Sequence, residues 1–132
     1  MKKQEIIDEV LDEIKTASQN PRGLVLHQRR LVLILSLGTM TLIELYFQKL
    51  NIWKEGSQIN HRWFHRKKEA LLKQLQNQII TPINSISNIN KIIDLAVKIE
   101  EKRDDLAYGA KTTEGALQEK INLFFSLQEL TK

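Results

Sequence analysis

The sequence predicts an all-α fold, an antiparallel bundle of four to five helices that forms one domain over residues 1–132. A length of 132 residues matches one ordinary domain with a single hydrophobic core. The chain has only two prolines and five glycines, and most of them stand where a helix is expected to end. Apolar residues recur at helical spacing along nearly the whole chain, which is the pattern of helices that bury one face.

The first expected helix is amphipathic, and Asn20-Pro21 and Gly23 end it. Acidic residues fill its polar face. Its buried face is predicted to consist of Ile6, Ile7, Val10, Leu11 and Ile14.

A longer and more apolar helix is expected from about residue 24 to residue 50, in which Ser36, Gly38 and Thr39 would let neighbouring helices approach closely. Its most apolar run, residues 31–47, holds 17 residues and includes Glu44. A membrane span needs about 20 apolar residues, and a charge near the bilayer centre is costly. We therefore expect the central helix of a bundle in water, and no contact with a membrane.

Three more helices are expected after a loop at residues 51–59. One runs from about 61 to 78 and ends before Thr81-Pro82, with Leu71, Leu72 and Leu75 facing inward. The next begins near residue 85 or 87 and continues to Tyr108, with Gly109 as a left-handed C-terminal cap. Thr112 or Thr113 caps the last helix, whose inward residues are Ala116, Leu117, Ile121, Phe124, Phe125 and Leu127.

The composition limits the kinds of site that the chain can form, and its first residues indicate a cellular location. Because the chain has no cysteine, it forms no disulfide, thiolate metal site or cysteine nucleophile. The first residues lack the apolar stretch of a signal peptide, so a cytoplasmic location is expected.

Positive charge is concentrated in the middle of the chain. Residues 22–73 carry ten lysines and arginines against three acidic residues, and all three histidines lie there as well. Such a segment can attract RNA, an acidic protein or an anionic membrane surface, and the charge alone does not choose among them.

One stretch, residues 100–109, places Arg103 and Tyr108 five residues apart at the end of a helical pattern. It resembles the R-x4-6-H signature of the HEPN family, the nucleotide-binding domains of higher eukaryotes and prokaryotes. The segments 44–50 and 60–64 also resemble the layout of small prokaryotic HEPN proteins. The same spacing recurs from Arg22 to His27, at the entry to the second helix, where the family does not place its site.

This resemblance implies a fold, an activity and partners. The fold would be an antiparallel helical bundle that forms a homodimer along the face carrying the motif. The activity would be metal-independent cleavage of RNA, and the partner would be a small nucleotidyltransferase in a toxin–antitoxin module. No cofactor is expected.

Tyr108 stands where the family has its histidine, and this changes the expected activity. Attack by a ribose 2′-hydroxyl needs a base, an acid and a cation for the developing charge. A tyrosine, with a reference pKa of about 10, is a poor base at neutral pH, whereas Arg103 can still hold a phosphate. We expect a weak or absent nuclease with a retained anion site, and Tyr108→His should create or increase cleavage if the cleft is intact.

Two acidic residues complete the catalytic candidates. Asp104 shares a helix face with Tyr108, so the phenol can simply bond the carboxylate while Arg103 pairs with Glu100 or with a neighbouring helix, as at an ordinary helix end. Glu44, inside an apolar helix, could form a salt bridge with Arg103 across the bundle, or it could simply reach the surface.

A second candidate surface combines cations with the rings of Trp63 and Phe64. It could hold single-stranded RNA by phosphate contacts and base stacking through His61, Arg62, His65, Arg66, Lys67 and Lys68. The alternative is that the two rings anchor the helix in the core and the charges stay solvated. His61 and His65 have helical ligand spacing, but no H-E-x-x-H arrangement accompanies them, so no zinc or other metal is expected.

Together, the basic segment and the resemblance to the HEPN family lead us to expect an RNA-binding protein or a weak, metal-independent endoribonuclease of HEPN type. The alternative is a non-enzymatic helical protein that docks an acidic partner through its basic middle segment.

Overall fold

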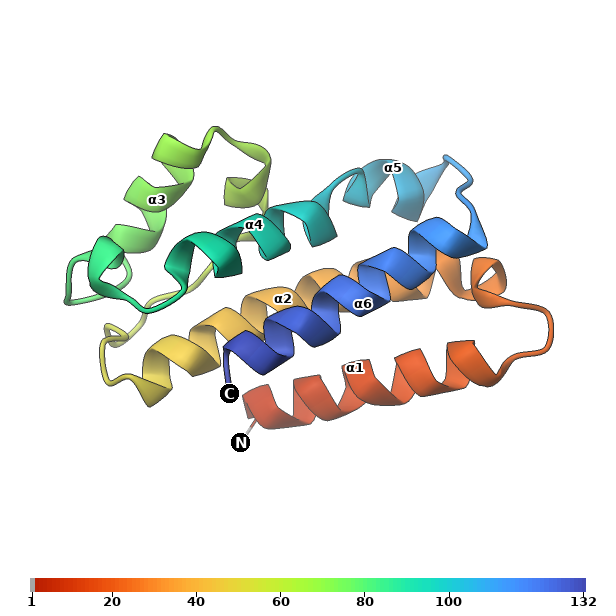
Figure 1. Ribbon diagram of the computed structural model, residues 1–132, viewed down its shortest axis with the longest axis horizontal. Coiled ribbons are helices and arrows are strands. Elements are labelled where there is room, and N and C mark those ends of the chain that lie inside the picture. The colour runs from red at the N-terminus through yellow and green to blue at the C-terminus, as the bar shows by residue number, and fades with distance from the viewer. Residues whose placement is uncertain (1) are drawn as a thin grey trace.

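The computed structural model describes residues 2–132, and over this range the protein is all-α with no strand (Figure 1). This confirms the predicted fold class. The elements in chain order are α1 (Lys2–Gln19), the 3-10 helix η1 (Leu24–His27), α2 (Gln28–Lys49), η2 (His61–His65), α3 (Lys68–Gln76), η3 (Ile83–Ser85), α4 (Ile89–Glu100), α5 (Arg103–Tyr108) and α6 (Glu114–Leu130). In Figure 1, α1 and α4 run in one direction along the long axis, and α2 and α6 run in the other.

Helix α2 lies at the centre, where it contacts α1, α4, α5 and α6. It and η1 together (Leu24–Lys49) are long and apolar enough to cross a membrane, but 67% of the most apolar window is buried inside the protein. Burial on several sides explains why this helix is apolar nearly all round.

Gly38 is the point of closest packing on α2. A Cβ atom at this position would lie 2.8 Å from Cε1 of Phe124 on α6 and 2.9 Å from Cγ2 of Val10 on α1. The expectation that Gly38 lets neighbouring helices approach is therefore confirmed.

The predicted helix from residue 85 or 87 to Tyr108 is wrong as a single element. Helix α4 ends at Glu100, and Lys102 then adopts a left-handed conformation with φ 58° before α5 begins. Lys120 of α6 stabilises this end, because its Nζ donates to the carbonyl oxygens of Ile99 at 2.7 Å and Glu101 at 2.8 Å. The break lets α4 pack on α6 while α5 packs on α2.

The predicted left-handed cap at Gly109 is wrong as well, since its φ of −179° is extended. By contrast, Thr113 caps α6 as predicted, because its hydroxyl accepts the N–H of Ala116 at 3.1 Å.

The predicted helix from 61 to 78 also divides in two. Residues 61–65 form the 3-10 helix η2, the chain is extended at Arg66, and α3 follows from Lys68. The side chain of Asn60 caps η2 by accepting the N–H of Arg62 at 2.9 Å, and Phe64 is buried beneath it. The 3-10 helix η2 packs against α4, α3 and α2.

Candidate functional site

A cleft opens between the start of α1, the middle of α2, the loop before η2 and the start of α5. Its polar and charged lining comes from Lys3, Ser36, Thr41, Glu44, Gln58, Asn60, His61, Arg62 and Arg103. Lys3, Arg62 and Arg103 are basic, and the imidazole of His61 lines the same cleft.

Arg103 is the first residue of α5, and two contacts hold its guanidinium group in this cleft. Its Nε donates to the Ser36 hydroxyl at 2.9 Å, and Nη1 donates to the Asp104 carboxylate at 2.6 Å. Its side chain is only 17% exposed. A guanidinium has five N–H donors, so three remain without a protein acceptor among residues 2–132. Arg103 is thus an oriented group with donors to spare for an anion.

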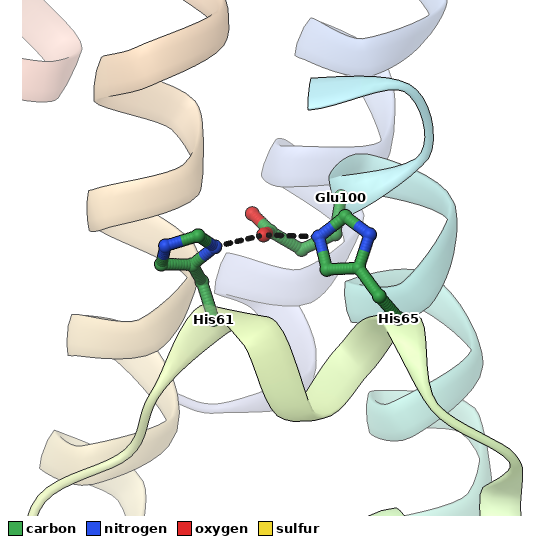
Figure 2. A group of neighbouring side chains, drawn as sticks. All are labelled: His61, His65 and Glu100. Atoms are coloured by element: carbon green, nitrogen blue, oxygen red, sulfur yellow. Dashed lines mark ion pairs between the residues drawn. The ribbon is translucent and has the colours of Figure 1, made fainter. Parts of the chain in front are cut away.

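Beside the cleft, two histidines of η2 face a glutamate of α4 (Figure 2). His61 Nδ1 lies 3.3 Å from Oε1 of Glu100, and His65 Nε2 lies 3.5 Å from the same oxygen. Glu100 is completely buried, yet neither carboxylate oxygen has an aligned hydrogen-bond donor among the described residues, and His61 Nδ1 has no aligned partner either. Figure 2 shows the second ring nitrogen of His61 on the side of the ring away from Glu100.

The surroundings of His61, and its burial above all, favour the neutral form of the imidazole. Burial lowers the pKa of His61 below its usual value, and the Arg103 guanidinium lowers it further, while Glu100 and Asp104 act in the opposite direction. A neutral imidazole can accept a proton or bind a metal ion.

The predicted catalytic residues do not all lie together. Tyr108 is 69% exposed at the end of α5 and is not among the residues that line the cleft with Arg103. Asp104 binds Arg103, and it makes no hydrogen bond with Tyr108. Arg103 and Tyr108, the two ends of the sequence motif, therefore do not share the cleft.

Glu44 lies in the cleft, but it does not form a salt bridge with Arg103, which was one of the two alternatives for this residue. Its carboxylate accepts the backbone N–H of Ile59 at 2.8 Å and pairs with Lys3 at 3.6 Å. Arg103 also forms no ion pair with Glu100 among the described residues, because Asp104 and Ser36 hold its guanidinium group.

The basic segment divides between two surfaces. His61 and Arg62 line the cleft, whereas Arg66 and Lys68 line a separate groove on α4, where Lys68 lies 3.9 Å from Asp94. Lys67 is exposed.

The two rings of this segment differ in position. Phe64 is only 2% exposed, whereas Trp63 packs partly buried against the core and also lines the cleft. Stacking of bases on Phe64 is therefore ruled out in this conformation, as the alternative interpretation predicted.

Glu100 was missed as a site residue, because sequence reasoning treated it as one charge in a solvated helix end. A signal was present, since Glu100 continues the stripe formed by Ile93 and Ala96, at i+7 and i+4. Both of those residues are buried. A carboxylate on a buried stripe requires partners, and the sequence does not show that His61 and His65 lie opposite it.

Comparison with known proteins finds no matching family model, no similar curated protein and no similar solved structure. The HEPN resemblance therefore stays an expectation from the motif.

Proposed function

We propose that this protein binds RNA in the cleft between α2 and η2, and that it is a HEPN-like bundle with weak, metal-independent endoribonuclease activity. One observation carries the proposal: Arg103, oriented by Ser36, shares the cleft with the cations of Lys3 and Arg62 and with His61.

The cleft suits a phosphodiester because of its charge and its geometry. An arginine fixed at two of its donors loses little freedom when it binds a phosphate, and neighbouring cations raise the local concentration of a polyanion. Two carboxylates offset part of this positive charge, since Glu44 lies 3.6 Å from the Lys3 ammonium group and Asp104 lies 2.6 Å from the Arg103 guanidinium group.

His61 supplies in this cleft the imidazole that the Arg103–Tyr108 motif lacks. It comes from a different element, η2, and one of its ring nitrogens lies next to Glu100. A carboxylate beside an imidazole stabilises the protonated ring that forms when it takes the hydroxyl proton. The cation on the phosphate would be Arg103.

Binding is tested with a labelled single-stranded RNA and two variants from the same segment. Arg62→Gln removes a charge from the cleft, and Lys67→Gln removes a charge outside it. Arg62→Gln should weaken binding and flatten the dependence of log K on log salt by about one unit, while Lys67→Gln should leave both nearly unchanged. Fluorescence anisotropy at several salt concentrations measures both quantities.

Arg103→Ala should weaken RNA binding further, because it removes the oriented group. Circular dichroism verifies that the variant remains helical. Equal losses in Arg62→Gln and Lys67→Gln would instead favour the alternative function, docking of an acidic partner over the whole basic segment. A homodimer and a nucleotidyltransferase partner remain expectations from the family resemblance.

A further inference from the structure

We propose that His61, His65 and Glu100 form a binding site for a divalent transition-metal ion of the zinc class. Two imidazole nitrogens and one carboxylate oxygen are a donor set that suits Zn²⁺, and three protein ligands leave a fourth position for water or another small ligand. The site goes beyond the proposed function, since ion binding requires no RNA.

The separations between the three donor atoms fit such an ion. One oxygen of Glu100 lies 3.3 Å from His61 Nδ1 and 3.5 Å from His65 Nε2, and all three ligand atoms lie within 4.8 Å of one another. Bonds of about 2.0–2.1 Å at tetrahedral angles place ligand atoms roughly 3.3–3.4 Å apart. Two of the three separations are therefore close to those of a metal site. Small side-chain rotations would bring the two histidine nitrogens, the third pair, to the same distance.

The rings are also oriented for ligation. Their planes are 82° apart with centroids at 6.1 Å, so they do not stack, and Figure 2 shows an edge of each ring turned toward the carboxylate. The two histidines reach Glu100 from one turn of η2, which lies alongside α4.

An independent observation is the unsatisfied state of the buried polar atoms. Glu100 is 0% exposed, and both of its oxygens lack an aligned hydrogen-bond donor, as does His61 Nδ1. Buried polar atoms are normally hydrogen-bonded, and a buried carboxylate without an aligned hydrogen bond is costly. A divalent cation between them would satisfy the nitrogen and at least one oxygen and would neutralise the charge.

Both sides of the site are held by the fold. Phe64 is buried beneath η2 and Asn60 caps its first turn, while Lys120 binds the carbonyl oxygens on either side of Glu100. The site is nevertheless accessible, because the side chain of His65 is 39% exposed and that of His61 is 26% exposed. Fixed ligands with an open side are what an ion-binding site requires.

The test uses the full chain after treatment with a chelator and dialysis. A calorimetric titration with Zn²⁺ should show one site per chain with a Kd below about 1 μM. Co²⁺, used as a spectroscopic probe, should give the visible absorption of a low-symmetry, four-coordinate site that Zn²⁺ then removes. Zn²⁺ should also raise the melting temperature.

Two ligand variants and one control decide the assignment. His65→Gln, at the more exposed ligand, should weaken Zn²⁺ binding by more than about 10-fold, the loss that even removal of an outer-shell partner typically causes. Glu100→Gln should do the same and should abolish the Co²⁺ absorption. Arg66→Gln, at the next residue, changes no ligand and should bind Zn²⁺ as the native protein does.

The proposal fails if the native protein binds no Zn²⁺ at this affinity, or if His65→Gln binds Zn²⁺ as tightly as the native protein. Undiminished binding by a folded Glu100→Gln variant would equally overturn the three-ligand site. If Glu100→Gln does not fold, His65→Gln alone decides. RNA binding by the metal-free protein is measured separately, so failure of the metal site and failure of the RNA cleft are distinguishable.

Discussion

At the scale of single residues, Lys120 shows how one side chain determines where a helix ends. It lies on α6, is only 8% exposed, and donates to carbonyl oxygens at the end of α4. Helix ends leave such carbonyls without partners, and a buried ammonium group satisfies them as water would at the surface. The contact lies beside the turn at Lys102, and its two acceptors flank the buried Glu100.

Lys120→Met should lower the free energy of unfolding by about 1–3 kcal/mol, because it leaves buried carbonyl oxygens without a donor. Lys91→Met on the exposed face of α4 is the control, and it should change stability little. Denaturation by urea measures both variants. A loss no larger than that of the control would show that water replaces the ammonium group.

The same lysine predicts a dependence on pH. Burial lowers the pKa of Lys120 from its usual value of 10.5, although Glu100 and Glu101 act in the opposite direction. Between the lowered pKa and 10.5, the unfolded chain keeps a proton that the folded protein has released, so stability rises with pH in this window. The stability difference between the native protein and Lys120→Met should therefore widen as pH rises toward 10.5. A constant difference would contradict the lowered pKa.

At the scale of elements, the contacts of α2 control the bundle. Its glycine sits where α1 and α6 both touch it, so this helix cannot move outward without opening the core. Glu114 links the start of α6 to η1, because its carboxylate accepts the backbone N–H groups of Leu24 at 2.9 Å and Val25 at 2.7 Å. The start of α6 is thereby tied to the entry of the central helix.

Gly38→Ala should destabilise the protein despite the better helix propensity of alanine. The new methyl group would lie within 3.0 Å of Phe124 and Val10, and overpacking of this kind costs about 1–3 kcal/mol, against a propensity gain of about 1 kcal/mol. Gly115→Ala on α6 is the matched control, since its nearest neighbour would be 4.0 Å away. Gly115→Ala should be neutral or slightly stabilising, and thermal unfolding compares the two. Equal stability of both variants would mean that the helices adjust freely around α2.

At the scale of the whole molecule, the candidate site is assembled from segments far apart in the chain. Arg103 follows the break after α4, Ser36 lies on α2, and His61 belongs to η2. The basic middle segment is divided by the same arrangement, with Arg62 in the cleft and Arg66 in another groove. The sequence motif therefore identifies Arg103 but not its partners.

This arrangement changes the expected result of Tyr108→His. Because Tyr108 is 69% exposed and lies outside the cleft, a histidine there should not create RNA cleavage, contrary to the expectation from the motif. His61→Gln should instead remove any cleavage that the native protein shows, with a loss of about 10²-fold or more for an acid-base group. Gel assays with labelled RNA and a chelator measure these rates. The opposite outcome would be that Tyr108→His gains cleavage and that the double variant with Arg103→Ala loses it again. That result would show that Arg103 and position 108 form the active site.

Local sequence patterns were enough to predict the all-α fold class and the central place of the apolar helix. Hydrophobic periodicity is a local signal, so α1, the close approach at Gly38 and the cap at Thr113 could be predicted from it. The end of α4 at Glu100 and the position of His61 and His65 opposite it became visible only in the folded chain. Those outcomes depend on Lys120 reaching the end of α4 and on η2 docking beside it, and such contacts between distant segments leave no periodic trace in a single sequence.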